Sequence, residues 1–235
     1  MDRRLVAAAL LLLSVPFLRA QAPADPSGHW EGSLQAQGVE LRVEVDLATN
    51  SKGELVGTIS TPAQNLKGLP LARVAVEGRS IRFHARADQP FNGVLSADGR
   101  SMSGTLTANG SSMPVNMSRT GDPRIEVPAK SAAIGKELEG TWNGTLNVNG
   151  TQLRLVLTMS SQSDGTAIGS IVNVDEGRLE IPASTITQAA SIVTLEFKTV
   201  GGSYSGALSN DGTELVGRYS QGALIVPVTF QKAAK

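Results

Sequence analysis

The two histidines, His29 and His84, are the side chains best suited to acid–base chemistry near neutral pH. A catalytic base needs a nucleophile and an orienting group, and a metal ion needs several ligands at matching spacing. The chain has no cysteine, no histidine pair at ligand spacing and no Gly-x-Ser-x-Gly nucleophile elbow. The sequence therefore predicts exposed strand histidines, no catalytic residue, no metal site and no cofactor. A Ser-His-Asp triad assembled from distant residues stays open.

Arg42 and Arg154 are candidate ligand- or partner-binding residues. They lie 112 positions apart and form the only identical basic pair between the two halves of the chain. The surrounding alternation places both on a polar face, where a guanidinium could bind an anion or a partner protein. Alternatively, each arginine is solvated, pairs across strands, or covers a tryptophan ring with its stem.

A loop near the middle of each half supplies the other candidates. Residues 62–65 align with residues 174–177, and binding residues often collect in loops. We therefore predict that Gln64, Asp175 and Gln221 contact a ligand or partner. The two loops differ in sequence, which equally fits a loop without a critical role.

The tryptophans and two aspartates have structural explanations. Trp30 and Trp142 are the only tryptophans, and their recurrence at one place favours a buried structural plug over the floor of a ligand pocket. Asp98 and Asp211 each precede a glycine, as turn-forming residues do. A calcium site would need more oxygen ligands than one aspartate per turn provides.

These residues recur because the chain contains one unit twice. Residues 28–34, Gly-His-Trp-Glu-Gly-Ser-Leu, return as residues 140–146, Gly-Thr-Trp-Asn-Gly-Thr-Leu. The offset is 112 as far as Pro70 and Pro182, and becomes 113 after one inserted residue. One insertion in such a length indicates two copies of one small domain.

Each copy shows the alternation of an antiparallel strand protein. Apolar and polar residues alternate over 39–47 and 153–159, and Asp-Gly pairs at 98–99 and 211–212 mark tight hairpins. In the first copy we expect strands near 29–36, 39–48, 55–61, 69–77, 80–87, 91–97, 101–108 and 111–119. The sequence thus predicts an all-β fold of two tandem eight-stranded antiparallel up-and-down barrels, with a β-sandwich or roll as the alternative.

The chain is expected to begin with an export signal. Arg3 and Arg4 precede an apolar run over residues 5–13, which is too short to span a bilayer, and small residues up to Ala24 offer cleavage sites. We predict a signal peptide over 1–22, repeat 1 over 23–119, a linker over 120–139 and repeat 2 over 140–235. Without cysteine there is no lipid anchor, so we expect a periplasmic or secreted protein with no transmembrane segment.

Charge and composition exclude one class of partner. Removal of residues 1–22 leaves 18 basic and 20 acidic side chains, and aromatic residues make up 4% of the chain. Nucleic-acid binding needs a basic face and stacking rings, so we expect no nucleic-acid partner.

The second copy resembles a known type of domain. It carries the motif of residues 140–146, the strand 153–157, the turn 175–177 and the glycine-rich stretches 202–212 and 217–222. In these it is similar to the lipocalin-like β-domain that precedes the catalytic domain in secreted bacterial α/β-hydrolases. The Gly-x-Trp of each first strand also resembles lipocalins. The hydrolase domain itself is missing, so the resemblance implies an accessory domain without activity.

We therefore expect a non-enzymatic, exported binding or accessory module for a small apolar ligand or an envelope protein partner. Two alternatives are a hydrolase-associated subunit or uncharacterised envelope enzyme, and a purely structural spacer. Val, Leu and Ile at the inward positions favour filled barrels, since eight strands leave room for side chains or one small ligand. The sequence does not determine the oligomeric state.

Overall fold

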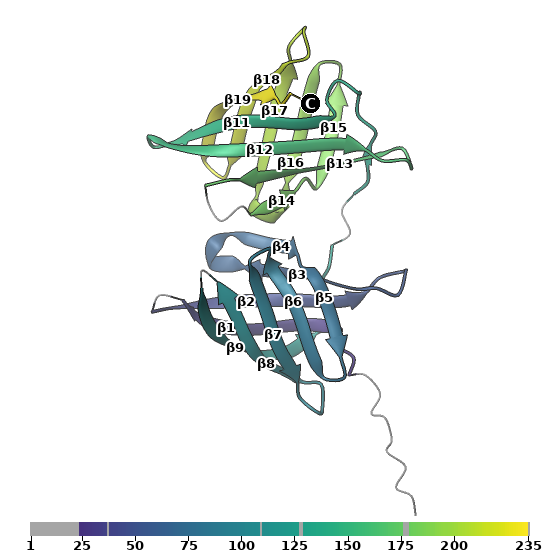
Figure 1. Ribbon diagram of the computed structural model, residues 1–235, viewed down its shortest axis with the longest axis vertical. Coiled ribbons are helices and arrows are strands. Elements are labelled where there is room, and N and C mark those ends of the chain that lie inside the picture. The colour runs from purple at the N-terminus through teal and green to yellow at the C-terminus, as the bar shows by residue number, and fades with distance from the viewer. Residues whose placement is uncertain (1–23, 37, 109, 127–128, 176–178, 235) are drawn as a thin grey trace, which may run out of the picture.

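The computed structural model describes residues 24–36, 38–108, 110–126, 129–175 and 179–234. It contains two antiparallel barrel-like sheets, one in each copy, which lie one above the other along the long axis of the molecule (Figure 1). The predicted signal peptide lies outside the described residues. Among the residues that the structure describes, no helix is long and apolar enough to cross a membrane.

The first barrel is one continuous sheet with the strand order β4-β3-β2-β1-β9-β8-β7-β6-β5. All its neighbouring strands are antiparallel. The strands are β1 (Gly28–Ala36), β2 (Val39–Thr49), β3 (Leu55–Thr61), β4 (Leu66–Pro70), β5 (Ala72–Glu77), β6 (Ser80–Arg86), β7 (Gln89–Leu95), β8 (Ser101–Ala108) and β9 (Ser111–Gly121).

The second barrel repeats this arrangement with the order β10-β13-β12-β11-β19-β18-β17-β16-β15, and β14 also pairs with β13. Its strands are β10 (Ser131–Ala132), β11 (Gly140–Val148), β12 (Thr151–Ser161), β13 (Thr166–Asn173), β14 (Glu180–Pro182), β15 (Thr185–Ala189), β16 (Ile192–Phe197), β17 (Gly202–Leu208), β18 (Glu214–Gln221) and β19 (Leu224–Lys232). The all-β, barrel-like prediction is confirmed, and neither copy divides into the two sheets of a sandwich.

The described residues of the first barrel form nine strands instead of the expected eight, because one stretch predicted as a single strand forms two. The stretch 69–77 divides into β4 and β5 at Leu71, whose N–H donates to Gly57 O at 2.8 Å as the last hydrogen bond in the β3–β4 register. Pro70 has no N–H to offer, and Arg73 has a positive φ of 52°. The chain therefore turns from one end of the sheet to the other here, and the barrel is nearly closed.

Each barrel is filled by its own apolar core. The largest fully buried side chains include Trp30, Phe83 and Phe91 in the first barrel and Trp142, Tyr204 and Phe230 in the second. This matches the expectation of filled barrels. The cavity lined by His29 and Lys198 lies between the barrels, and a smaller pocket lined by Glu31 and Arg42 lies on the outer face of β1 and β2.

The two tryptophans are buried in the same way, each with no exposed surface. Trp30 Nε1 donates to Pro26 O, and Trp142 Nε1 donates to Leu138 O, both at 2.9 Å. A cation of the last strand covers each ring, Arg119 at 4.9 Å and Lys232 at 5.0 Å from the centroid. These cations, rather than Arg42 and Arg154, stack on the indoles.

The segment expected as a linker contributes to the second barrel. β10 pairs with β13, and Ile134 and Leu138 are buried in the second core. The second barrel therefore draws on residues before Gly140.

Candidate functional site

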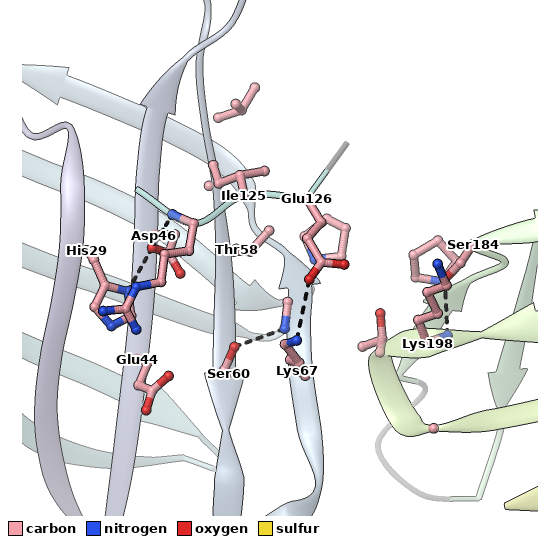
Figure 2. A pocket seen from close by; sticks show the side chains of 18 of the residues that line it. His29, Glu44, Asp46, Thr58, Ser60, Lys67, Ile125, Glu126, Ser184 and Lys198 are labelled. Carbon is pink, nitrogen blue, oxygen red and sulfur yellow. Dashed lines mark hydrogen bonds and ion pairs between the residues drawn. The ribbon is translucent and has the colours of Figure 1, made fainter. Parts of the chain in front are cut away.

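A cavity of about 830 Å³ lies between the two barrels. Its first wall is the outer face of β1 to β4, its roof is residues 124–126 and Ala129, and its second wall is residues 182–184 with η2 (Lys198–Val200) and Gly201 (Figure 2). Ligand pockets commonly have volumes of about 300–1,000 Å³ and lie between domains. The cavity is therefore the candidate binding site.

The barrels meet beside this cavity at the carbonyl of Val200. Gln221 Nε2 donates to Val200 O at 2.9 Å, and Asn65 Nδ2 of the first barrel reaches the same oxygen at 3.4 Å. The side chains of Leu179 and Val200 pack against the first core. These contacts hold one wall of the cavity against the other.

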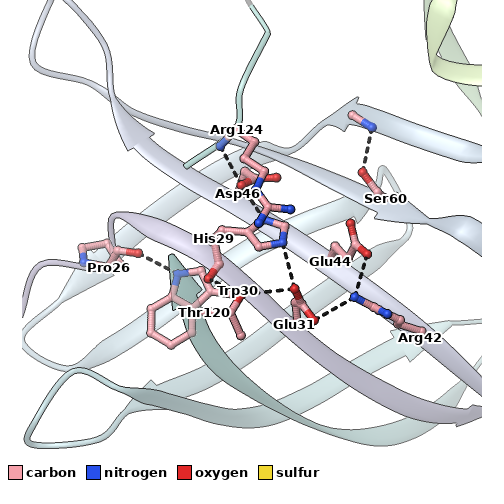
Figure 3. Close-up of polar contacts among 11 residues, drawn as sticks. Pro26, His29, Trp30, Glu31, Arg42, Glu44, Asp46, Ser60, Thr120 and Arg124 are labelled. Carbon is pink, nitrogen blue, oxygen red and sulfur yellow. Dashed lines mark hydrogen bonds and ion pairs between the residues drawn. The ribbon is translucent and has the colours of Figure 1, made fainter. Parts of the chain in front are cut away.

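His29 is the main correction to the expected site. It was predicted to be an exposed strand histidine, but only 1% of it is accessible. Its Nδ1 lies 2.7 Å from Asp46 Oδ1, and its Nε2 lies 3.4 Å from Glu31 Oε1 (Figure 3). Arg124 N also donates to Asp46 Oδ1, at 2.8 Å. The imidazole is on the outer face of the barrel, yet the chain around Arg124 lies over it.

Local strand geometry explains this pairing. In the β1–β2 hairpin Ala36 is opposite Val39, and the same register places His29 opposite Asp46. Directly opposed residues have Cβ atoms about 5 Å apart, so an imidazole and a carboxylate can meet. The second copy has Thr141 and Thr158 at these positions, so the pair belongs to the first copy alone.

The acidic side chains of the cavity have basic neighbours, whereas two of its basic side chains have no carboxylate close by in the described part of the chain. Among the described residues, every acidic side chain of the lining lies beside a basic side chain: Glu44 beside Arg42, Asp46 beside His29, and Glu126 beside Lys67. Within the same part of the chain, Arg124 and Lys198 have no carboxylate within ion-pair distance. The cavity thus presents two cations that are free to meet an anion.

Arg42 and Arg154 do not form one site. Arg42 Nη2 lies 2.8 Å from Glu31 Oε2 and 3.2 Å from Glu44 Oε1, beside the cavity. Arg154 binds Asp175 instead, with Nη2 at 2.6 Å and Nε at 3.0 Å from Oδ1. These hydrogen bonds lower the pKa of Asp175 and raise that of Arg154. Both arginines are occupied by carboxylates of their own barrel.

The remaining predicted contacts separate into two places. Gln64 is exposed on η1 (Pro62–Gln64), next to Asn65, so its loop and Gln221 meet at Val200 O. Asp175 lies with Arg154 elsewhere, and residues 176–177 of its loop lie outside the described residues. Gln221 and Asn65, the neighbour of Gln64, therefore share Val200 O, and Asp175 does not join them.

His84 and the two turn aspartates play local roles. His84 Nδ1 lies 3.1 Å from Ala87 O, and Asp98 and Asp211 accept hydrogen bonds from their own turns. Those hydrogen bonds lower the pKa of both aspartates. Within the described ranges, no cluster of three or more His, Asp and Glu side chains has the arrangement of a metal site.

Sequence reasoning missed Asp46, Arg124 and Lys198. A signal for Asp46 existed, because hairpin register places it opposite His29. No comparable signal identified Arg124 or Lys198, which line one cavity only because one barrel packs on the other.

Comparison with known proteins leaves the chain without a family. It matches no protein-family model and no curated protein. One similar solved structure is a Bacteroides fragilis NCTC 9343 protein, provisionally described as an outer membrane protein, with 12% identity, coverage of 88% of this chain and 97% of that one, and a TM-score of 0.27.

Two further solved structures are similar at the same low level. A protein of unknown function from the DUF3598 family of Nostoc punctiforme PCC 73102 has 12% identity, coverage of 88% and 96%, and a TM-score of 0.26. MucB in complex with MucA(peri) has 11% identity, coverage of 91% of each chain, and a TM-score of 0.22. Such similarity carries no functional argument, so function is argued below from the cavity.

Proposed function

We propose that the protein is an exported, non-enzymatic binding module that holds an acidic segment of an envelope protein between its barrels. The observation that carries this proposal is the inter-barrel cavity with Arg124 on its roof and Lys198 on its far wall, both without an ionic partner among the described residues. An acidic segment that crosses the cavity would place a separate carboxylate against each cation and gain charge-assisted hydrogen bonds from both. Export rests on the N-terminal sequence.

The cavity favours a charged ligand over the small apolar ligand expected from the sequence. Its lining includes the polar or charged side chains His29, Glu44, Asp46, Lys67, Arg124 and Lys198, and the barrel interiors are filled. An apolar molecule would bury these groups without replacing their hydrogen bonds to water, which is unfavourable.

Binding of a labelled oligoglutamate peptide by the exported protein tests this proposal. Lys198→Glu and Arg124→Glu should each weaken binding about tenfold, or about 1.4 kcal/mol, and added salt should weaken it further. Lys52→Glu is the matched control, because Lys52 carries the same charge in an exposed turn outside the cavity. Equal loss in all three variants, or no binding by the wild type, would contradict the proposal.

Native mass spectrometry of the protein purified from its own host separates a protein segment from a small anion. A small bound molecule would appear as a mass excess that disappears on denaturation. A protein partner would instead be recovered by photo-crosslinking from position 198. Lys52 again serves as the control position for the crosslinker.

A catalytic role for the His29–Asp46 pair is the second candidate, because a buried imidazole held by a carboxylate is also part of a hydrolase triad. Ser60 lines the same cavity but lies on β3, two strands from His29, or about 10 Å across the sheet. Its Oγ already accepts a hydrogen bond from Gly68 N at 2.9 Å. Covalent labelling by a fluorophosphonate, lost in Ser60→Ala, would favour catalysis over our proposal.

A further inference from the structure

One difference between the two barrels is the short strand β10. In the second barrel, Ser131 and Ala132 pair with Ala167 and Thr166 of β13, and Ala133 N donates to Gly165 O at 3.0 Å. On its other side, Ser131 Oγ accepts a hydrogen bond from Ile186 N of β15 at 2.7 Å. β10 therefore closes the space between the two ends of the sheet.

The residues after β10 extend this closure into the core. Ile134 is 7% exposed and belongs to the second core, and its carbonyl accepts a hydrogen bond from Ser161 Oγ at 3.2 Å. Gly135 N donates to Gln188 Oε1 at 2.7 Å. The segment 131–135 is thus anchored by main-chain hydrogen bonds and one aliphatic side chain.

The first barrel has no such strand among its described residues. The internal offset of 112 places the counterpart of β10 at residues 19–20 and that of Ile134 at Ala22. Residues 19, 20 and 22 all lie within the predicted signal peptide, so cleavage after residue 22 would remove them. The described chain starts beyond this point, where Ala24 N donates to Gly78 O at the end of β5.

In the first barrel, the side chains that correspond to those around β10 are more exposed to solvent. Val74 is half-buried where Ile186 is buried, and Leu55 is half-buried where Ala167 is buried. β4 pairs with β3 only from Thr58 onward, so the outer edge of β3 at Leu55 has no ladder partner within the described residues. On β5 a bulge interrupts the ladder between Ala72 and Ala75, so β3 is the edge that can accept a strand.

We infer that the first barrel binds an extended segment of a partner protein by strand addition at the edge of β3. The segment takes the place that β10 occupies in the second barrel. It needs small residues where it crosses the edge and an aliphatic residue two or three positions later, as in Ser131-Ala-Ala-Ile134. Main-chain hydrogen bonds provide affinity in this mode of recognition, and the aliphatic anchor provides selectivity. This edge is separate from the charged groups that carry the proposed function.

Disulfide trapping tests this inference, because the chain has no cysteine of its own. The probe is a peptide with the sequence of residues 129–136 and a cysteine at the position of Ala132, and the protein is the processed, exported form with Glu54→Cys. Glu54 is exposed and corresponds to Thr166, which lies directly opposite Ala132. Directly opposed residues in antiparallel strands have Cα atoms about 4.5–5.5 Å apart, within the range that a disulfide spans.

We expect the peptide to form a mixed disulfide with Glu54→Cys at least tenfold more readily than with Ser103→Cys, an exposed control position on β8. A peptide with Ile134→Asp should lose this preference. In the wild-type protein, the unmodified peptide should slow hydrogen exchange at the amide of Leu55, which faces the outer edge of β3. Equal trapping at both cysteines, or unchanged exchange at β3, would overturn the inference without affecting the proposed cavity.

Discussion

At the residue scale, the least expected group is a histidine on the outer face of a barrel that solvent does not reach. His29 and Asp46 are both buried, at 1% and 6% exposure, and the imidazole lies between two carboxylates. A buried polar group that loses its partner costs more than the hydrogen bond itself contributes, because its desolvation is no longer compensated. The pair is therefore best understood as two groups that depend on each other.

A double-variant experiment at these positions tests that dependence. His29→Thr or Asp46→Thr alone should lower the free energy of unfolding by about 1–3 kcal/mol, since each leaves a buried partner unsatisfied. The double variant, which copies Thr141 and Thr158 of the second barrel, should recover part of the loss. Urea denaturation of all four proteins gives the coupling energy. Strictly additive losses would show that the two groups do not depend on each other.

At the element scale, each barrel is bent at a pair of glycines that face each other across two strands. Gly93 is opposite Gly104 in the first barrel, and Gly206 is opposite Gly217 in the second. The ring of Phe91 or Tyr204, two residues earlier, lies where a side chain on Gly93 or Gly206 would be. The glycines therefore make room for a core aromatic ring and for close approach of the two strands.

Gly104→Ala should be strongly destabilising for this reason. A Cβ at Gly104 would collide with the carbonyl oxygen of Asn92 and lie 2.6 Å from Gly93 Cα, and backbone atoms cannot move aside easily. Overpacking of this kind costs about 1–3 kcal/mol. Gly121→Ala, on β9 of the same barrel, is the control, because no atom lies within 4 Å of its Cβ position. Thermal unfolding should separate the two variants, and similar melting temperatures would refute the steric argument.

At the scale of the whole molecule, duplication has produced two barrels with different surroundings. Residues between the copies cover His29 on one side and complete the second core on the other. The same segment forms the roof of the inter-barrel cavity. The cavity therefore exists only in the assembled pair, and neither copy forms it alone.

Fragments of the second barrel test where its folding unit begins. A fragment of residues 129–235 should be more stable than one of residues 140–235, which lacks β10, Ile134 and Leu138. Burial of the two aliphatic side chains alone contributes about 3–6 kcal/mol. The shorter fragment also loses the Leu138 carbonyl that Trp142 Nε1 binds. Equal midpoints in urea would show that the unit begins at Gly140.

The sequence by itself determined what depends on local pattern. Alternation and turn residues determined the strands, and the repeat showed that both copies share one fold, with a buried tryptophan in each. The break at Leu71 was not predictable, since it depends on the chain leaving β3 at this point to pair with β6 at the other end of the sheet. The exposed histidine prediction was wrong for His29, because covering residues come from a distant part of the chain.

The candidate site was decided almost entirely by tertiary structure. Arg42, Arg154 and Asp175 were chosen for their recurrence or loop position, and each is satisfied by a neighbour in its own barrel. Arg124 and Lys198 carry the proposed site, although no pattern marks them. Periodicity reports which face of a strand is apolar, whereas a site between domains depends on which surfaces meet, and only packing in three dimensions determines that.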